Sequence, residues 1–493
     1  MKKTGDRIKV SLVSLGCSKN QVDSEVMLGL LKQDGFEFTP DTEKAEVIIV
    51  NTCGFIDAAK EESIETLIEL GKLKKEGRCK VLVAAGCLAQ RYGDELLSEL
   101  KELDAVVGTG DFPEIAKLCQ KLSKKTVKRS EPSMMVSQPA FLYDVATPRL
   151  RLSPPHWAYV KISEGCNYRC SFCSIPSFRG DIQSRPADSI IAEVQQLAEE
   201  GVKEVNLIAQ SLTSYGLDWK KKGELPKLLK RLTAVNGIRW IRLFYAYPTD
   251  LTDDLIELIA AEEKICSYVD LPLQHIDDEI LRKMRRKGDS RLIRSLLEKL
   301  RSRIPHLFMR TTFIVGFPGE TEAQFGKLLD FVGEGWFNRI GVFGYSHEDG
   351  TPAHEFSDSV SVEEKNERRN RLTTLQEEVS LSKNHALIGT IQEVMVEGRD
   401  EETQELFGRL EGQAPEIDGV VILEQRANAS VGRGRLHPVL PVEGDGRSPI
   451  IKGQAPEIDG MVALEGDAGP GEFVKVEITG ATELDLSGKI LGA

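Results

Sequence analysis

The sequence predicts an α/β protein in three parts: an N-terminal parallel α/β sheet domain, a central partial barrel of six βα units and a small C-terminal β-barrel. Three observations support this prediction. Apolar runs alternate with helical patterns up to about residue 123, βα repeats begin again at Ala158, and short strands separated by turns follow Gly389. The length of 493 residues agrees, because a chain of this size divides into about three domains.

The composition favours a globular protein of the cytoplasm. Hydrophobic residues make up 41% of the chain and charged residues 29%, which are ordinary values. No run of about 18 apolar residues could span a bilayer, so no membrane partner is expected, and the start of the chain does not resemble a signal peptide. The net charge of −13 argues against a surface devoted to nucleic acid. In a reducing compartment, nine cysteines indicate metal ligands or chemistry rather than disulfides.

Residues 7–123 form the first predicted domain. Its expected strands and helices are, in order, 8–15, 21–33, 47–50, 57–75, 80–85, 93–103 and 105–107. Three of the strands are followed by a cysteine beside a glycine, at Cys17, Cys53 and Cys87. Parallel strands end at one edge of a sheet, so three thiolates far apart in sequence should meet there. Coincidental small residues at strand ends are the alternative. The repeated arrangement favours a metal cluster with one open iron.

Residues 124–151 contain several Lys, Arg and Pro residues without a sustained period, which predicts an extended linker. The second domain, 152–385, has six expected strands at 158–162, 204–209, 238–244, 268–273, 308–315 and 340–345. Six βα units are too few to close an eight-stranded barrel. A partial barrel is therefore predicted.

The loop after the first of these strands contains Cys166, Cys170 and Cys173 in a CxxxCxxC spacing. Three thiolates can hold a four-iron cluster and leave one iron open to a small molecule. A structural zinc site, completed by a distant Cys or His, is the alternative. The remaining thiols lie outside any motif and are expected to be buried and inert: Cys79, Cys119 and Cys266.

Polar residues and glycines also follow the other strands, where barrel chemistry is located. They are Gln210, Tyr245, Tyr247, Gln274, His275 and Gly316. Each could equally be a solvated loop residue, and His275 is expected to be a hydrogen-bonding neighbour rather than a ligand. Arg179 and Arg185, after the cysteine loop, could either meet an anionic substrate or lie on a solvated surface.

The cysteine loop, with Phe172 before its third cysteine and Ile175-Pro176 after it, resembles the signature of the radical S-adenosylmethionine (SAM) enzymes. That resemblance implies a cluster whose open iron binds SAM, with Phe172 near the adenine. It also implies that Gln210 and the loop beginning at Gly316 lie along bound SAM. The six βα units fit the partial barrel of that family.

The N-terminal cysteine trio and the element Ser14-Leu-Gly-Cys-Ser-Lys-Asn-Gln-Val-Asp-Ser-Glu25 resemble the methylthiotransferases, a radical SAM subfamily, and within it the RimO branch. The tRNA-modifying MiaB branch typically has a Tyr-Gly-Cys-Gln-Met-Asn type of sequence instead. The resemblance implies two 4Fe-4S clusters and SAM as cofactors. Cys166, Cys170 and Cys173 would hold the cluster that splits SAM, and Cys17, Cys53 and Cys87 would hold the cluster that delivers sulfur.

Residues 387–493 resemble the TRAM domain that ends methylthiotransferases, with Gly-Gln-Ala-Pro-Glu-Ile-Asp-Gly at 412–419 as the family-like element. The element occurs again at 453–460, and 424–452 is expected to be an insertion, so either copy could belong to the β-barrel. This domain has 20 acidic and 9 basic residues, a net charge of −11. Such a module would repel phosphates and suits a basic protein partner, so RNA binding is not expected as its main mode. A solubilising acidic face is the alternative.

The resemblance implies a SAM-dependent enzyme that inserts a methylthio group at the β-carbon of an aspartate in the S-twelve protein of the small ribosomal subunit. A flavodoxin or ferredoxin would supply electrons. No catalytic residue beyond the cluster ligands is identified. A tRNA methylthiotransferase of the MiaB type is the nearest alternative, and a non-enzymatic, zinc-binding module that docks on ribosomes is a more distant one.

Overall fold

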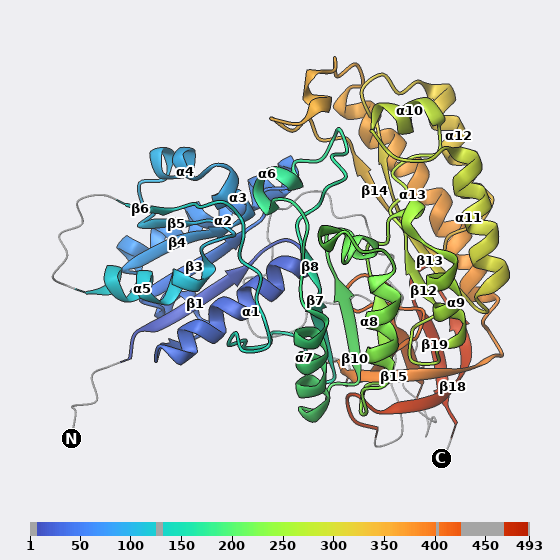
Figure 1. Ribbon diagram of the computed structural model, residues 1–493, viewed down its shortest axis with the longest axis horizontal. Helices are drawn as coiled ribbons and strands as arrows, with labels where there is room; N and C mark the ends of the chain where they lie inside the picture. The colour runs from blue at the N-terminus through green and yellow to red at the C-terminus, as the bar shows by residue number, and fades with distance from the viewer. Residues whose placement is uncertain (1–6, 125–131, 401–403, 425–467, 492–493) are drawn as a thin grey trace, which may run out of the picture.

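The computed structural model describes residues 7–124, 132–400, 404–424 and 468–491. It has the three predicted parts, with the N-terminal sheet domain beside the central barrel and the terminal barrel beneath it (Figure 1). The predicted fold class is confirmed. Across the four described ranges, no helix is both long and apolar enough to cross a membrane.

The N-terminal domain is a six-stranded parallel sheet in the order β2-β1-β3-β4-β5-β6. The strands are β1 (Lys9–Ser14), β2 (Glu37–Phe38), β3 (Val47–Thr52), β4 (Val81–Gly86), β5 (Ala105–Val107) and β6 (Ser133–Met135). Every residue of β3 and β4 is buried, which explains their continuous apolar runs, because helices cover both faces of a parallel sheet. One face packs on α1 (Ser18–Gln33) and α5 (Ile115–Ser123), the other on α2 (Asp57–Glu76), α3 (Cys87–Arg91) and α4 (Gly93–Glu99).

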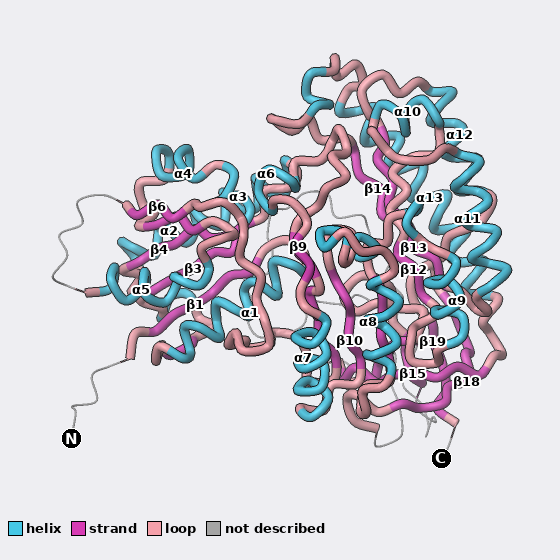
Figure 2. Tube along the Cα trace, viewed as in Figure 1, coloured by secondary structure: helices cyan, strands magenta, loops and turns pink. Residues whose placement is uncertain are grey.

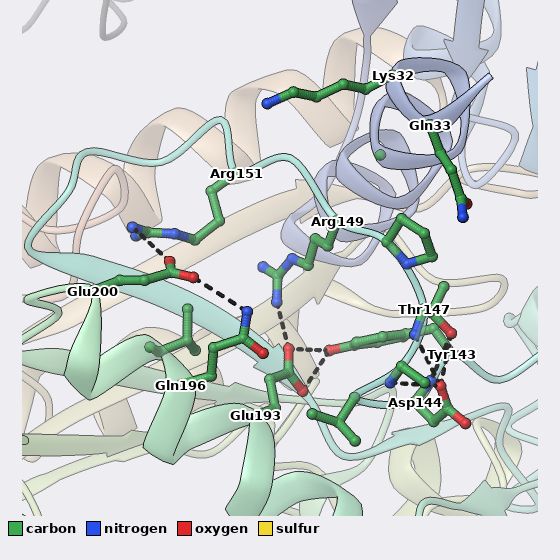
Figure 3. A pocket seen from close by; sticks show the side chains of 15 residues that line it. Lys32, Gln33, Tyr143, Asp144, Thr147, Arg149, Arg151, Glu193, Gln196 and Glu200 are labelled. Atoms are coloured by element: carbon green, nitrogen blue, oxygen red, sulfur yellow. Dashed lines mark hydrogen bonds and ion pairs between the residues drawn. The ribbon is translucent and has the colours of Figure 1, made fainter. Parts of the chain in front are cut away.

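The segment predicted as an extended linker has more structure than its sequence indicates. It contributes β6, which pairs with β5, and residues 143–151 then run as a strap between α1 and α7 (Ala187–Glu199). Figure 3 shows Arg149 of this strap beside Glu193 of α7. The Arg149 guanidinium donates to Glu193 Oε1 at 2.7 Å and to Glu25 Oε2 of α1 at 2.7 Å. The strap therefore ties the first domain to the second.

Six parallel strands form the central partial barrel. They are β7 (Trp157–Lys161), β10 (Glu204–Ile208), β11 (Trp240–Leu243), β12 (Tyr268–Asp270), β13 (Phe308–Val315) and β14 (Arg339–Gly344). They pair as two three-stranded sheets, β7-β10-β11 and β12-β13-β14, and a parallel bridge between Ile241 and Ile265 lies where the two sheets meet. The expected strands thus occur: β13 has the predicted bounds, and the other five are shorter or shifted at their ends.

Helices cover the outer side of the strands (Figure 2). They are α7, α8 (Glu224–Thr233), α9 (Asp253–Ala261), α11 (Ser290–Arg303), α12 (Glu322–Gly333) and α13 (Val362–His385). Shorter elements of the loops are β8 (Ser163–Glu164), β9 (Gln183–Ser184), α6 (Ile175–Arg179), α10 (Asp278–Lys283) and the 3-10 turns Thr42–Lys44, Phe112–Glu114, Leu212–Ser214, Leu217–Trp219, Pro248–Asp250 and Pro352–Glu355.

The partial barrel packs on its neighbours through one shared cluster of buried side chains. Val22 and Val26 of α1 and Ala414 of the terminal domain pack in the same cluster as Tyr159 and Phe244 of the barrel. Helix α1 lies against β7 at one side of the barrel, and the segment after β16 packs against Phe308, where β13 begins. The opposite end of the barrel, where its strands end, is called the mouth, and the first two domains build it together.

The terminal domain is a closed barrel in the order β15-β16-β17-β19-β18. Its strands are β15 (Ile391–Arg399), β16 (Leu406–Leu410), β17 (Val421–Glu424), β18 (Phe473–Ala481) and β19 (Leu486–Ile490). All pairs are antiparallel except β17 with β19, which are parallel. The first repeated element, 412–419, packs under the central barrel, where Gly412 lies against the Phe308 ring and Asp418 accepts from the Tyr268 hydroxyl at 2.9 Å. The second copy and the expected insertion, except Glu424, lie outside the described residues.

A buried ion network joins the terminal domain to the central barrel and uses one acidic residue of the terminal domain, Glu397. Glu204 of β10 is fully buried and pairs with Arg242 at 2.8 Å and with Arg409 at 2.5 Å. Arg409 also pairs with Glu397, which accepts from His156 at 2.8 Å. Burial alone would raise the pKa of Glu204, but the two guanidinium groups outweigh it, and the pKa lies below its ordinary value. These acidic groups hold the domains together and do not face a partner.

Candidate functional site

The three N-terminal cysteines lie at the carboxyl edge of adjacent strands. Cys17 caps α1 after β1, Cys53 follows β3, and Cys87 begins α3 after β4. Their loops touch: a Cβ on Gly16 would lie 3.1 Å from Cys53 Sγ, and one on Gly54 would lie 3.0 Å from the carbonyl carbon of Cys87. The sheet therefore brings together the three thiols that the sequence separates.

A glycine is required where β4 turns into α3. Gly86 has φ +96°, and a Cβ there would lie 2.2 Å from Asn51 Oδ1. A side chain would meet both the steric contact and the cost of a left-handed backbone. The glycine beside Cys87 thus sets the position of that cysteine against β3.

Burial controls the protonation of Cys53 and Cys87. It raises the pKa of Cys53 to about 11 and that of Cys87 to about 12, because a thiolate is poorly solvated there. Neighbouring thiols raise both values further, while the Arg179 guanidinium opposes the shift. Without a bound cation these cysteines stay protonated at neutral pH, and metal coordination would ionise them.

The second cysteine group follows β7 and the short strand β8. The backbone N–H of Cys166 donates to the Gly180 carbonyl at 3.0 Å, and that of Cys173 donates to the Cys170 carbonyl at 3.1 Å. Burial raises the pKa of Cys166 to about 12 and raises that of Cys173 as well. The loop is compact and its thiols are held for coordination.

Within the part of the chain that the structure describes, no group of three His, Cys, Asp or Glu side chains is arranged to hold a single metal ion. In a 4Fe-4S cluster each thiolate binds a different iron, so its ligands stand further apart than those of one ion. Two groups of three mutually close thiols, all buried or half-buried except the exposed Cys17, fit clusters of that kind in donor type and number.

The two cysteine groups are linked by one side chain. Arg179 ends α6, the helix directly after Cys173. Its Nε and Nη2 donate to Cys87 Sγ at 3.2 and 3.0 Å, and its Nη1 donates to Asp23 Oδ2 at 2.6 Å. It also pairs with Glu164, which accepts from Lys161 at 2.5 Å. A buried charge network thus spans the interface between the two domains.

Of the two alternatives for Arg179 and Arg185, the solvated surface is wrong. Each guanidinium is buried, at 3% and 0% exposure, and each is already paired with a carboxylate. Arg185 pairs with Glu193 at 2.6 Å. A solvated surface role is excluded by burial, and an anionic substrate would have to displace these partners.

The structure also shows the contacts of Phe172, Gln210 and Gly316, the three further residues predicted to contribute to the site. Phe172 packs against the apolar cluster that contains Phe317. The Gln210 side-chain amide donates to Glu164, while its Oε1 has no partner among the described residues. Gly316 has φ +70°, and its N–H donates to Glu320.

His275 is a hydrogen-bonding neighbour, as predicted. It is fully buried, accepts at Nδ1 from the Asp277 N–H at 2.9 Å, and has Nε2 at 3.4 Å from Glu320 Oε1. These contacts indicate that His275 has a structural role at the mouth of the barrel.

Sequence reasoning missed the polar side of α1. Lys19, Asn20 and Asp23 are all buried, although a first helical turn is usually solvated. Lys19 Nζ lies 3.2 Å from the centroid of the Tyr245 ring, and Asn20 Oδ1 lies 3.4 Å from Cys87 Sγ. The available signal was a run of polar residues directly after a ligand-type cysteine at a strand end.

Three family models match the chain in consecutive parts. The family described as "Uncharacterized protein family UPF0004" matches residues 9–108, the Radical SAM superfamily matches 160–332, and the TRAM domain matches twice, at 388–446 and 444–491. The matches follow the three parts of the fold.

Curated relatives match over nearly their full length. A ribosomal protein uS12 methylthiotransferase RimO from Syntrophotalea carbinolica is 51% identical over 87% of this chain and 93% of its own. Another, from Anaeromyxobacter sp. (strain K), is 46% identical over 98% of this chain and 93% of its own. Both lie well above the similarity that defines a family.

Solved structures share the fold. The radical SAM methyltransferase TsrM from Kitasatospora setae, with cobalamin and a 4Fe-4S cluster bound, has a TM-score of 0.51 at 15% identity and covers 70% of this chain and 74% of its own. The cobalamin-dependent SAM radical enzyme OxsB has a TM-score of 0.50 at 12% identity, over 75% of this chain and 56% of its own.

Proposed function

The chain belongs to the RimO family of radical SAM methylthiotransferases, and on that premise we propose that it inserts a methylthio group at the β-carbon of an aspartate of ribosomal protein uS12. The family makes it a SAM-dependent enzyme with a 4Fe-4S cluster. The aspartate target and a second cluster are our proposal. They agree with the Ser-Lys-Asn sequence after Cys17, where the tRNA-modifying branch has Gln-Met-Asn.

The observation that carries the proposal is that Arg179 joins the two groups of three cysteines. Cys166, Cys170 and Cys173 would hold the cluster that binds SAM. A second cluster would be held by Cys17, Cys53 and Cys87. Their loops are adjacent, and Cys17 and Cys53 are near enough to raise the pKa of Cys87, which supports this assignment. When bound, these groups supply one-electron cleavage of SAM and the sulfur that is transferred.

The protein's own residues position and shield the reaction. Helix α1 packs against β7 beside the mouth, and the network of Arg179, Asp23, Lys161 and Glu164 fixes the two cysteine loops relative to each other. We propose that Phe172, Gln210 and Gly316 lie along SAM. The unpartnered Gln210 Oε1 is an acceptor suited to a bound ligand.

The proposed division of the chain follows these roles. Residues 7–123 carry the auxiliary group, 124–151 form the connection, 152–385 form the radical SAM barrel, and 387–493 form the TRAM-like barrel. The enzyme would act in the cytoplasm with a flavodoxin or ferredoxin as electron donor. Because Glu472, Glu477 and Glu483 are exposed on the terminal domain, we infer a basic protein partner there rather than RNA as the main one.

Mass spectrometry of uS12 and of bulk tRNA nucleosides, from cells with and without the enzyme, tests this function. We expect the methylthio group on the uS12 aspartate to be lost without the enzyme, and tRNA to be unchanged. A change in tRNA alone would assign the chain to the other substrate. Iron and sulfide analysis after anaerobic reconstitution completes the test: about two clusters per chain are expected, whereas zinc without sulfide would indicate a binding module.

A further inference from the structure

Lys19 is a buried cation without an anionic partner. Only 8% of it is exposed, and among the described residues no carboxylate lies within 4.0 Å of its Nζ. The other charged residues in the first half of this helix are paired: Asp23 with Lys161 at 2.6 Å and Glu25 with Arg149 at 2.5 Å. The Lys19 ammonium lies over the face of the Tyr245 ring, 3.2 Å from its centroid. Burying an ammonium without a counter-charge is costly, so an anion is expected to complete this site.

The Lys19 ammonium lies close to the N-terminal cysteines and to the mouth of the barrel. Lys19 stands in the first turn of α1, two residues after Cys17, and the neighbouring Asn20 reaches Cys87 Sγ. Tyr245 follows β11 at the mouth of the partial barrel. The pair therefore lies between the auxiliary cysteine group and the barrel, where the target side chain must reach both.

Tyr245 is held in an unusual conformation. Its φ is +62°, in the left-handed region that side chains rarely adopt, and its N–H donates to the buried Asp270 carboxylate at 3.1 Å. Conformations of this kind persist where the surroundings enforce them, commonly at binding sites. The strained residue presents its ring to the Lys19 ammonium and fixes the direction of that charge.

We propose that the Lys19 ammonium, seated on the Tyr245 ring, binds the side-chain carboxylate of the substrate aspartate. This rests on the proposed function and names the group that recognises its target. A carboxylate could also come from the methionyl part of SAM. The substrate is favoured because the tRNA-modifying motif Gly-Cys-Gln-Met-Asn has Met at the position of Lys19, and a nucleobase target has no carboxylate.

The test measures binding of full-length uS12, with Asp or Asn at the modified position, to the reconstituted full-length enzyme in the presence of SAM. The wild-type enzyme should bind the Asp form about 10-fold to 100-fold more tightly, the range for a hydrogen bond to a charged group. Lys19→Met should bind both forms equally, with SAM affinity unchanged, and Lys19→Arg should keep much of the preference. Lys19→Gln is a second neutral variant if Lys19→Met does not fold.

Lys32→Met is the matched control. It makes the same substitution at an exposed lysine in the last turn of the same helix, so the Asp preference should persist. The inference is overturned if Lys19→Met or Lys19→Gln discriminates Asp from Asn as well as the wild type does, or if the loss is in SAM affinity instead. A wild-type enzyme that methylthiolates uS12 but binds both forms equally would also overturn it and leave the proposed function standing. Failure of the wild type to modify uS12 would reject the function itself.

Discussion

Arg179 donates two hydrogen bonds to the Sγ of Cys87, at 3.2 Å from Nε and 3.0 Å from Nη2. The donor belongs to the helix that follows the barrel cysteines, and the acceptor belongs to the N-terminal sheet. Hydrogen bonds to cluster sulfurs help set reduction potentials, because they stabilise the more negative reduced state. The loop that would serve SAM cleavage would therefore also adjust the electronic properties of the proposed second cluster.

Replacing Arg179 should shift that potential. Arg179→Gln is expected to lower the midpoint potential of the auxiliary cluster by roughly 40 mV, if about 1 kcal/mol of hydrogen bonding to the reduced state is lost. Potentiometric titration followed by electron paramagnetic resonance measures it. Arg185→Gln is the control, because Arg185 is equally buried but pairs with Glu193 and no cysteine. Equal shifts in both variants would contradict the role of the sulfur contacts.

The two cysteine groups should be separable by mutation. Cys173→Ala is expected to abolish SAM cleavage, whereas Cys87→Ala should leave cleavage and stop sulfur transfer. Each should lose about half of the bound iron, because one of two clusters is lost. Cys119→Ala serves as control, since Cys119 is fully buried in the sheet domain away from both groups. Methylthiolation by both ligand variants would disprove the assigned roles.

The buried ion network should hold the terminal barrel in place. Glu204→Gln leaves Arg242 and Arg409 without their shared carboxylate, which should cost about 3 to 5 kcal/mol of unfolding free energy. Glu393→Gln removes an ion pair with Arg239 that is half exposed, and should cost at most about 1 kcal/mol. Denaturant titration compares the two. Similar losses would show that the network contributes little.

Asp485 should make stability depend on pH. Burial raises its pKa to about 6, although its carboxylate accepts from the Val420 N–H at 2.8 Å. The folded state therefore favours the protonated form, and the stability from Asp485 is present below pH 4 and is lost as pH rises through 6. Relative to Asp485→Asn, the wild type should lose roughly 2 to 3 kcal/mol between pH 4 and 7. Parallel pH profiles of unfolding free energy for the two proteins would refute this.

The turn before Cys87 should not tolerate a side chain. Gly86→Ala should destabilise the protein by more than the roughly 1 kcal/mol expected for a left-handed alanine, because the added carbon meets Asn51. Gly35→Ala is a close control, since Gly35 has φ +85° and nothing within 4 Å of an added Cβ. Thermal unfolding and iron content measure both effects. The same cost at both positions would show that the contact with Asn51 relaxes freely.

The sequence predicts the fold class well because apolar runs and helical periods are local signals. It also places Cys17, Cys53 and Cys87 at strand ends, although their role as ligands remains a prediction. The charge network was not predictable, because Arg179 and Cys87 are separated by 92 residues and belong to different domains. The structure of the strap was not predictable for a similar reason. Arg149 is ordered by carboxylates on two helices, and pairing of this kind leaves no local pattern in the sequence.

The contacts of helix α1 limit which domains can be exchanged between related proteins. Its first half carries the Lys19 contact with the barrel mouth, the Asp23 pair with Lys161 and the Glu25 pair with Arg149. Chimeras that exchange only the N-terminal domain between relatives would break these pairs wherever the recipient barrel has different residues. The N-terminal and central domains would therefore have to be exchanged together, and the buried pairs of Glu204 with Arg242 and Arg409 set the same requirement for the terminal barrel.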